Sequence, residues 1–494
     1  MPMSDSLRPL PAPMFGFEQA RHLLWRSGFG GTRQQIDRLA GMGLERAVDL
    51  VVNFRAVSDE KLDPAPADPD LLGPPTPQLR EMMQAARESD DPAVRDRLRA
   101  EQLRRRGEDR QVMAQIQSWW LARMIASPRP FEESLTLLWH NHFATSFRSV
   151  RNSYLMYQQN EMFRAHAMGS FADLLRNIVR DPAMIRYLNN DRNIKRSPNE
   201  NLARELMELF SLGEGNYTER DIKEGARALT GYGRRHNDFE FRSGQHDSGQ
   251  KHILGRTGEY DGDDFVEILL RQEVCPIFIA YKIYRHFVAD VDVTIRGPQR
   301  TVIRALADEL RKSDYALEPP LRTLLTSRHF YDPRIVGNKI KSPVQLIVGA
   351  VRSLGTPTRD IAMLSDAAAQ MGQQLFAPPS VAGWAGGRSW INTSTLFVRQ
   401  NLTTFLLSGK LPYDDHWDRG KVDYDPTPLL QGVDERSAER VVDHLMPLLF
   451  GQSVAAGRRE QFVSFLDQRG ASVSRDRLLG LLLMMTSTPE YQLC

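Results

Sequence analysis

The sequence predicts a mainly α-helical protein: a multi-helical body with a short β-hairpin or extended excursion near residues 232–256. Through most of the chain apolar residues recur every three or four positions, as in Val112, Ile116 and Trp120. That spacing is typical of the buried face of a helix. Several runs also follow helix-start signals such as Asp181-Pro182. By contrast, apolar and polar residues alternate in the segment from about 231 to 260, and glycines interrupt it. This pattern favours short strands joined by turns.

Taken in order, the chain divides into four predicted regions. A proline-rich start and helices near 17–27, 32–43 and 43–54 form an N-terminal helical arm, residues 1–56. A linker or surface loop rich in proline and aspartate follows at 57–78. The main helical domain, which carries the polar motifs, covers 79–405, and a C-terminal helical segment covers 406–494.

Within the main domain the pattern predicts helices over 79–127, interrupted near Asp90–Pro92, and then over 131–143, 154–166 and 171–190. Two more helices fall within 197–221, and others follow Asp261 and cover 278–288, 299–330 and 343–354. The loop 376–390 combines proline, glycine and tryptophan, a composition that favours a rigid, exposed platform.

Composition excludes several classes of protein. There are 64 Lys and Arg against 62 Asp and Glu, which gives a net charge of +2. No strong electrostatic field that would attract nucleic acid or a membrane surface is therefore expected. The basic run at 95–110 is interleaved with acids, which favours a solvated helix face. Two cysteines, Cys275 and Cys494, are too few for a disulfide framework or a thiolate metal site, so two free thiols are expected.

No apolar run is long enough to cross a bilayer, so no membrane span is predicted. The first residues lack the pattern of a secretory signal, and a cytoplasmic location is therefore expected. The chain has no nucleophile elbow, zincin motif, P-loop, EF-hand loop or dinucleotide fingerprint. Common hydrolase, kinase and dehydrogenase assignments thus have no support.

The densest polar stretch is Ser197–Asp221. At helical spacing Arg204, Glu205 and Glu208 share a polar wedge with Asn201, opposite an apolar face. Ser197 to Glu200 forms a capping box with proline at the first helical position, and a similar signal begins at Thr218. The polar wedge is either a solvated face on which the glutamates pair with Arg204, or a carboxylate face that supplies metal ligands or acid/base groups.

Two histidine motifs add to this stretch. His140 and His142 would diverge on a helix but converge on an extended segment, where they could ligate a metal; alternatively His142 is a core histidine. His246 and Asp247 lie in the alternating segment and could simply stabilise a turn. Together the three motifs would make a nitrogen and oxygen site for a divalent metal of the Zn, Mn or Fe type.

The same motifs carry a family resemblance. The runs WHNHFATS (139–146), RDPAMIRYLNN (180–190), NENLARELMELFSLGEGNYTERD (199–221), ARALTGY (226–232) and HDSGQKHILG (246–255) resemble the bacterial family catalogued as Domain of Unknown Function 1800. So do HLLWRSGFGGT (22–32), KSPVQLIVGAVRSLG (341–355) and APPSVAGWAGGRSW (377–390). The resemblance implies a mostly helical protein, often encoded beside a sulfatase-like partner family and often exported. Periplasmic export with a partner is therefore the alternative to the cytoplasm.

Two functional hypotheses follow. The first is a metal-dependent enzyme, hydrolase or oxidoreductase, with a pocket of histidines and carboxylates. Its candidate metal ligands are His140, His142, Glu205, Glu208, His246 and Asp247. Its candidate catalytic residues are Arg204, Glu205, Glu208, His246 and Asp247, with Arg204 orienting a carboxylate or binding an anionic substrate. The second is a non-catalytic scaffold or accessory protein for the sulfatase-like partner, docking through the loop 376–390.

Overall fold

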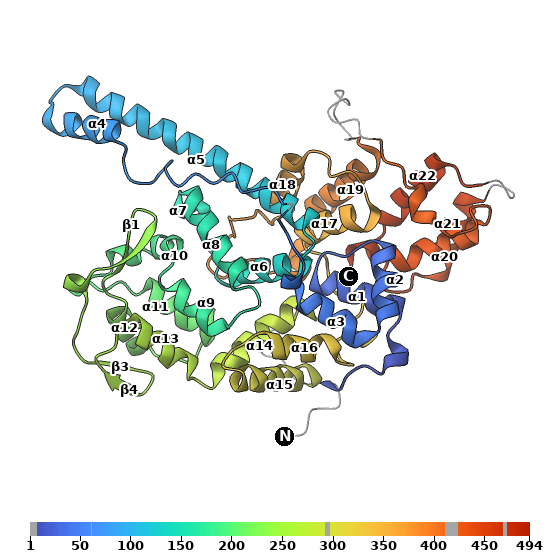
Figure 1. Cartoon of the computed structure of the whole chain (residues 1–494), viewed down its shortest axis with the longest axis horizontal. Coiled ribbons are helices and arrows are strands. Elements are labelled where there is room, and N and C mark those ends of the chain that lie inside the picture. Colours follow the sequence, from blue (N-terminus) through green and yellow to red (C-terminus); the bar gives the residue numbers. More distant parts are fainter. Residues whose placement is uncertain (1–6, 61, 292–296, 411–422, 468–471) are drawn as a thin grey trace.

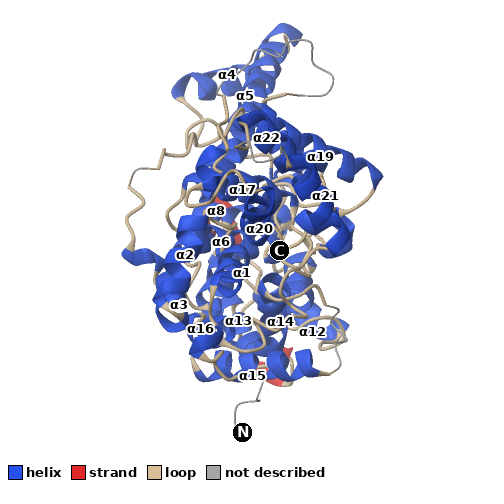
Figure 2. Cartoon of the chain, turned by 90° about the vertical axis from the view of Figure 1, so that its right-hand side faces the viewer, coloured by secondary structure: helices blue, strands red, loops and turns tan. Residues whose placement is uncertain are grey.

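The computed structural model describes residues 7–60, 62–291, 297–410, 423–467 and 472–494. Helices dominate it, and the strands in the described residues form two small antiparallel hairpins (Figure 2). The predicted fold class is confirmed. The predicted excursion contains both hairpins, β1 (Tyr232–Arg235) with β2 (Asp238–Phe241), and β3 (Lys251–Ile253) with β4 (Arg256–Gly258).

The first helices run from the N-terminus to a long projecting pair. They are α1 (Phe17–Ser27), α2 (Arg33–Met42), α3 (Leu44–Val52), α4 (Pro77–Glu88) and α5 (Pro92–Ala126). In Figure 1, α4 and the first half of α5 project from the body. The predicted break falls between these two helices, where Asp91 caps the start of α5.

The middle of the chain continues as short helices. They are α6 (Pro130–His142), α7 (Phe147–Val150), α8 (Ser153–Ala165), α9 (Phe171–Ile178), α10 (Pro182–Tyr187), α11 (Asn201–Glu205), α12 (Glu219–Ala228), α13 (Gly262–Leu270), α14 (Val274–Phe287), α15 (Pro298–Lys312) and α16 (Glu318–Thr326). The last third supplies α17 (Pro343–Leu354), α18 (Ile361–Gln370), α19 (Thr393–Ser408), α20 (Ala438–Leu449), α21 (Ala456–Leu466) and α22 (Arg475–Thr486).

Two hydrophobic cores hold these helices together. The first joins α1–α3 to side chains from residues 131–335. The second joins side chains from 113–156 to the helices after residue 343. Each core therefore draws on more than one of the four regions predicted from the sequence. In Figure 1, α1–α3 accordingly lie close to α16, between the middle helices and the C-terminal ones.

Helix α6 belongs to both cores. Nearly all of its side chains are buried; Leu135, Leu138 and Trp139 enter the first core and Leu137 enters the second. A helix that is buried on all sides has no solvent-facing stripe, so its polar residues must find partners inside the protein. Those partners define the candidate site described below.

The polar stretch 197–221 departs from its predicted form at both ends of its first helix. The predicted capping box at Ser197–Glu200 is wrong, because α11 begins only at Asn201 and Glu200 makes no side-chain cap. The helix then widens into a π-helix, Leu206–Ser211. π-helical turns are rare in proteins, and those that occur are often found at functional sites. The capping box predicted at Thr218 is confirmed, with Asp221 as its partner.

Two further predictions from the sequence concern membrane spans and the two cysteines. No helix in the described ranges has the length and apolar character needed to cross a membrane. Cys275 and Cys494 are both free and buried, as predicted.

The contact between α1 and α17 is close enough to require glycine. A Cβ added at Gly349 would lie 2.3 Å from the Trp25 ring. We therefore expect Gly349→Ala to destabilise the protein by about 1–3 kcal/mol despite alanine's better helix propensity, since buried overpacking displaces both helices. Urea unfolding measures the change. Gly41→Ala in α2 is the matched control, because Gly41 has open space around it and should gain roughly 0.5–1 kcal/mol. Equal effects would contradict this account.

Candidate functional site

The segment Trp139–Phe143 is anchored by three consecutive polar side chains at the end of α6. His140 comes first: its Nε2 accepts a hydrogen bond of 3.1 Å from the backbone N–H of Phe376. Its ring packs against the rings of Trp120, Phe376 and Trp384. Burial lowers the pKa of His140 to about 3, so the imidazole is neutral at physiological pH. Its Nε2 already has this backbone partner.

Asn141 makes the second anchor. Its Oδ1 accepts a hydrogen bond of 2.7 Å from the backbone N–H of Trp384. Gly383 approaches so closely that an added Cβ would lie 2.3 Å from the Asn141 carbonyl oxygen, and its φ of +78° is itself favourable only for glycine. The loop 376–390 is therefore held against α6. The loop is exposed at residues such as Ser380 and Arg388, but the tryptophans predicted to form its platform are buried: Trp384 is 5% exposed and Trp390 is 7% exposed.

His142 makes the third anchor, to the π-helix. Its Nε2 donates a hydrogen bond of 3.0 Å to the carbonyl oxygen of Phe210, at the end of the π-helix where carbonyls lack helical partners. Since a carbonyl can only accept, the proton is on Nε2 and Nδ1 carries a lone pair. Nδ1 is buried and has no hydrogen-bond partner within the described ranges of the chain. Burial, followed by the positive charge of Lys282, holds the pKa of His142 well below its usual range.

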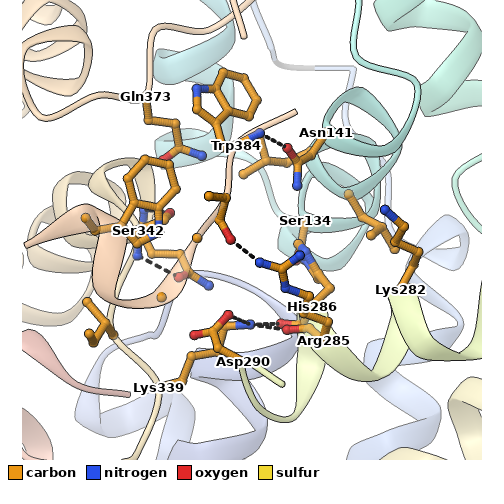
Figure 3. A pocket seen from close by; sticks show the side chains of 18 of the residues that line it. Ser134, Asn141, Lys282, Arg285, His286, Asp290, Lys339, Ser342, Gln373 and Trp384 are labelled. Carbon is orange, nitrogen blue, oxygen red and sulfur yellow. Dashed lines mark hydrogen bonds and ion pairs between the residues drawn. The ribbon is translucent and has the colours of Figure 1, made fainter. Parts of the chain in front are cut away.

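His142 and Asn141 line a partly open cavity of about 100 Å³ (Figure 3). Its walls come from α6, α14, the segment 339–345 and the loop 382–390. Four of the motifs that carry the family resemblance thus meet here: 22–32, through Phe29, and 139–146, 341–355 and 377–390. The cavity therefore lies between the end of a buried helix and the loop that is anchored to it.

Positive charge gathers in this cavity. Lys282 and Arg285 come from α14, Lys339 lies before α17, and Asp290 is the acidic residue among the lining side chains. Lys339 donates to the carbonyl oxygens of Arg285 and His286, and its Nζ lies 3.7 Å from a carboxylate oxygen of Asp290. Burial lowers the pKa of Lys339 to about 8. One acid therefore faces three cationic side chains.

Arg285 and Lys282 differ in how they are satisfied. Arg285 donates to the carbonyl oxygen of Ala385 in the loop. Lys282 is half-buried, with its Nζ 4.9 Å from the centre of the Phe278 ring. Within the described part of the chain it makes no hydrogen bond or ion pair. Burial, then the nearby Arg285 charge, lowers the pKa of Lys282 to about 8.

The neutral polar groups of the cavity are oriented as donors. The side-chain oxygen of Gln345 accepts from the backbone N–H of Ser342 at 3.0 Å, and that of Gln373 accepts from Val344 at 3.0 Å. Asn141 likewise uses its oxygen on a backbone N–H. Because each amide oxygen is occupied, the amide NH₂ groups of all three residues remain as donors toward the cavity that they line.

Ser134 and His286 form a polar pair on the cavity wall. The Ser134 hydroxyl and His286 Nε2 are 3.2 Å apart. Burial first, and then the charges of Lys339 and Arg26, lower the pKa of His286 to about 3. A neutral histidine in this place adds no charge to the cavity, so its positive character comes from the two lysines and the arginine.

The predicted carboxylate face lies elsewhere, and its Arg204 and Glu208 have local partners. Arg204 pairs with Glu200 at 3.2 Å and with Glu219 at 2.9 Å. Glu208 accepts a hydrogen bond of 2.6 Å from the hydroxyl of Tyr217. Burial and the neighbouring Glu208 raise the pKa of Glu205. The face is half-buried and connects to the next helix rather than to the histidines.

The His246–Asp247 motif has a similar local role. Asp247 accepts a hydrogen bond of 2.7 Å from Nε of Arg227, and this ion pair lowers the pKa of the carboxyl. His246 donates from Nδ1 to the carbonyl oxygen of Thr230 at 2.8 Å. Both residues hold the segment between the two hairpins onto α12.

The six predicted metal ligands therefore do not come together as one group. Among the described residues no group of three or more His, Cys, Asp or Glu side chains is placed to hold a metal ion. His140 and His142 lie on a helix, where side chains two positions apart diverge, and they reach different partners. Of the predicted site residues His142 lines the cavity, and a metal cofactor stays a prediction of the sequence.

Sequence reasoning missed the cationic residues. The run FIAYKIYRHFV was interpreted as a buried helix, and α14 is one. Its basic residues at 282, 285 and 286 are spaced by three and four, however, so they share one helix face. Three basic residues on one side of an otherwise apolar helix were the available signal.

The fold and the cavity together define a mainly helical protein built around a buried helix and a basic cavity. The model of the family described as "Protein of unknown function (DUF1800)" matches residues 22–493, and the chain belongs to that family. No curated protein and no solved structure matches the chain.

The buried neutral His140 predicts a specific acid sensitivity. Its pKa is lowered in the folded protein, so below pH 6.5 the unfolded chain binds a proton that the folded chain does not. Its contribution to stability is therefore present above about pH 6.5 and is lost as pH falls toward 3. His140→Gln keeps a hydrogen-bond acceptor but does not titrate. We expect wild type to be more stable at pH 7.5, and the difference to shrink by about 1 kcal/mol per pH unit below pH 6.

Urea unfolding at pH 7.5, 6 and 5 measures this difference in free energy. His236→Asn is the matched control, because His236 is exposed and its substitution should leave the pH dependence of wild type unchanged. A difference between wild type and His140→Gln that does not vary with pH would contradict the assignment of a buried neutral His140.

Proposed function

We propose that this protein is an enzyme whose substrate carries a small anionic group, such as a carboxylate or another oxyanion, and binds it in the basic cavity. The observation that carries the proposal is the convergence of Lys282, Arg285 and Lys339 on one cavity in a chain whose net charge is only +2. Such a concentration of one charge in a hollow raises the local concentration of ligands of the opposite charge.

The positive charge of Lys282 in the cavity favours a bound anion. A half-buried ammonium without an anionic partner costs free energy, and burial of charge is normally accompanied by pairing. Asp290 lies near Lys339, and the described residues offer Lys282 no such partner. An anion bound in the cavity would supply that partner. The free amide NH₂ groups of Asn141, Gln345 and Gln373 add neutral donors, as oxyanion recognition requires.

Binding of small oxyanions tests this proposal. Isothermal titration calorimetry with inorganic phosphate and with oxalate, at ionic strength held constant with KCl, should show saturable binding to wild type. Lys282→Met should weaken binding about tenfold, the usual loss when one charge-assisted hydrogen bond is removed. Lys282→Arg should keep the affinity within about threefold, because the charge remains.

Lys223→Met is the matched control, since Lys223 is exposed on α12 and does not line the cavity. This variant should bind like wild type. Absence of binding to wild type, or equal binding by wild type and Lys282→Met, would overturn the proposal. Far-ultraviolet circular dichroism confirms that each variant is folded.

The metal-dependent version of the enzyme hypothesis has its own test. The unpartnered Nδ1 of His142 is a ligand of the right type for Zn, Mn or Fe, but the cationic side chains around the cavity favour an anion over a divalent cation. If the metal version holds, purified protein contains stoichiometric metal, and His142→Ala and Glu205→Ala lower its content. Elemental analysis before and after chelation measures this. Metal-free protein whose melting does not respond to added metal would contradict it.

The accessory-protein hypothesis loses the surface on which it was based. It assigned docking of the sulfatase-like partner to the loop 376–390, whose tryptophans are buried against α6 and its neighbours. The partner itself stays a prediction from the family resemblance. Co-purification from the native host tests it independently of the cavity.

A further inference from the structure

The amine of Lys282 differs from the other cationic groups of the cavity. Lys339 donates to two carbonyl oxygens and lies near Asp290, and Arg285 donates to a carbonyl oxygen of the loop. Lys282 reaches the same cavity with no hydrogen bond or ion pair among the described residues. Figure 3 shows it on the cavity wall, away from the group formed by Lys339 and Asp290.

Burial and a neighbouring like charge make the ammonium form of this amine less favourable than that of a solvated lysine. The Phe278 ring lies against it, and Arg285, one helical turn away, adds a like charge. His142 packs against the same ring, with 6.3 Å between the ring centres, and is neutral. Burial combined with a neighbouring cation is the arrangement that makes a lysine nucleophilic, because both disfavour the ammonium, and here they outweigh the attraction of the Phe278 ring face for it. The lowered pKa of Lys282, about 8, agrees with this.

We propose that Lys282 is a catalytic nucleophile that forms an imine with the carbonyl carbon of a small 2-oxo acid. This inference rests on the proposed function, because the cationic and amide donors of the cavity would hold the carboxylate while Lys282 meets the adjacent carbonyl. A cavity of about 100 Å³ suits a compound of a few heavy atoms, well below the size of a drug-like ligand.

The chemistry balances without a cofactor. The Lys282 ammonium first loses a proton to solvent, and the free amine adds to the carbonyl carbon to form a C–N bond. The nitrogen gives up one proton to form a carbinolamine and its second proton as the C=N bond forms, and the carbonyl oxygen takes up two protons and leaves as water. The product is an imine between Lys282 and the 2-oxo acid, and no electron donor or acceptor is consumed.

Reductive trapping tests this inference. The full chain is incubated with pyruvate as the probe and sodium cyanoborohydride, which reduces an imine to a stable secondary amine. Intact mass and peptide mapping should show one reduced pyruvate adduct on Lys282, saturable in pyruvate and slowed by phosphate. Lys223→Met should be labelled on Lys282 like wild type, whereas Lys282→Arg should carry no adduct and still bind phosphate.

The outcomes separate this inference from the proposed function. Phosphate binding without an adduct on Lys282 would overturn the imine and leave the anion site standing. If the wild type does not bind phosphate, both the imine and the anion site are overturned. Adducts spread over exposed lysines, with no preference for Lys282 and no competition by phosphate, would also overturn the inference. Because the wild-type measurements alone decide these outcomes, a variant that fails to fold does not rescue the proposal.

Discussion

Three consecutive side chains at the end of α6 attach two distant parts of the chain, the loop 376–390 and the π-helix, to one buried helix. His140 accepts from Phe376, Asn141 accepts from Trp384, and His142 donates to Phe210. Inside a protein a polar group without a partner costs free energy, so these bonds constrain where each segment can lie. The loop 376–390 and the π-helix are therefore positioned by the same helical turn, and the cavity walls follow from that.

The cavity illustrates how a protein keeps positive charge in a partly buried place. Lys339 and Arg285 are tolerated because backbone carbonyls, and for Lys339 also a carboxylate, replace water around them. Nearby histidines stay neutral, because burial and the adjacent cations both disfavour their protonation. Among the described residues Lys282 has the Phe278 ring beside it, but no carbonyl or carboxylate partner. A residue whose local environment is unfavourable without a ligand is a reasonable place to look for function.

The polar stretch 197–221 shows how density of charged residues can mislead. Arg204 and Glu208 find partners in the following turn and helix, so most of the polar wedge stabilises local structure. The helical projection assumed regular spacing, whereas the chain widens into a π-helix at Leu206. Conversely, α14 looked like an ordinary core helix, because apolar residues outnumber the basic ones that reach the cavity.

By itself the sequence determined the helical class, the break before α5, the capping box at Thr218, and the hairpin region, because these depend on interactions within a few residues. Family membership also follows from the sequence, since long motifs are specific. Only the tertiary structure decided which polar residues share a cavity. Lys282 and Lys339 are far apart in the chain, and their proximity depends on how α6, α14 and the loop 376–390 pack. Spacing along the chain carries no information about that packing. For this reason the predicted metal ligands do not form one group in the structure, and the basic cavity was not predicted.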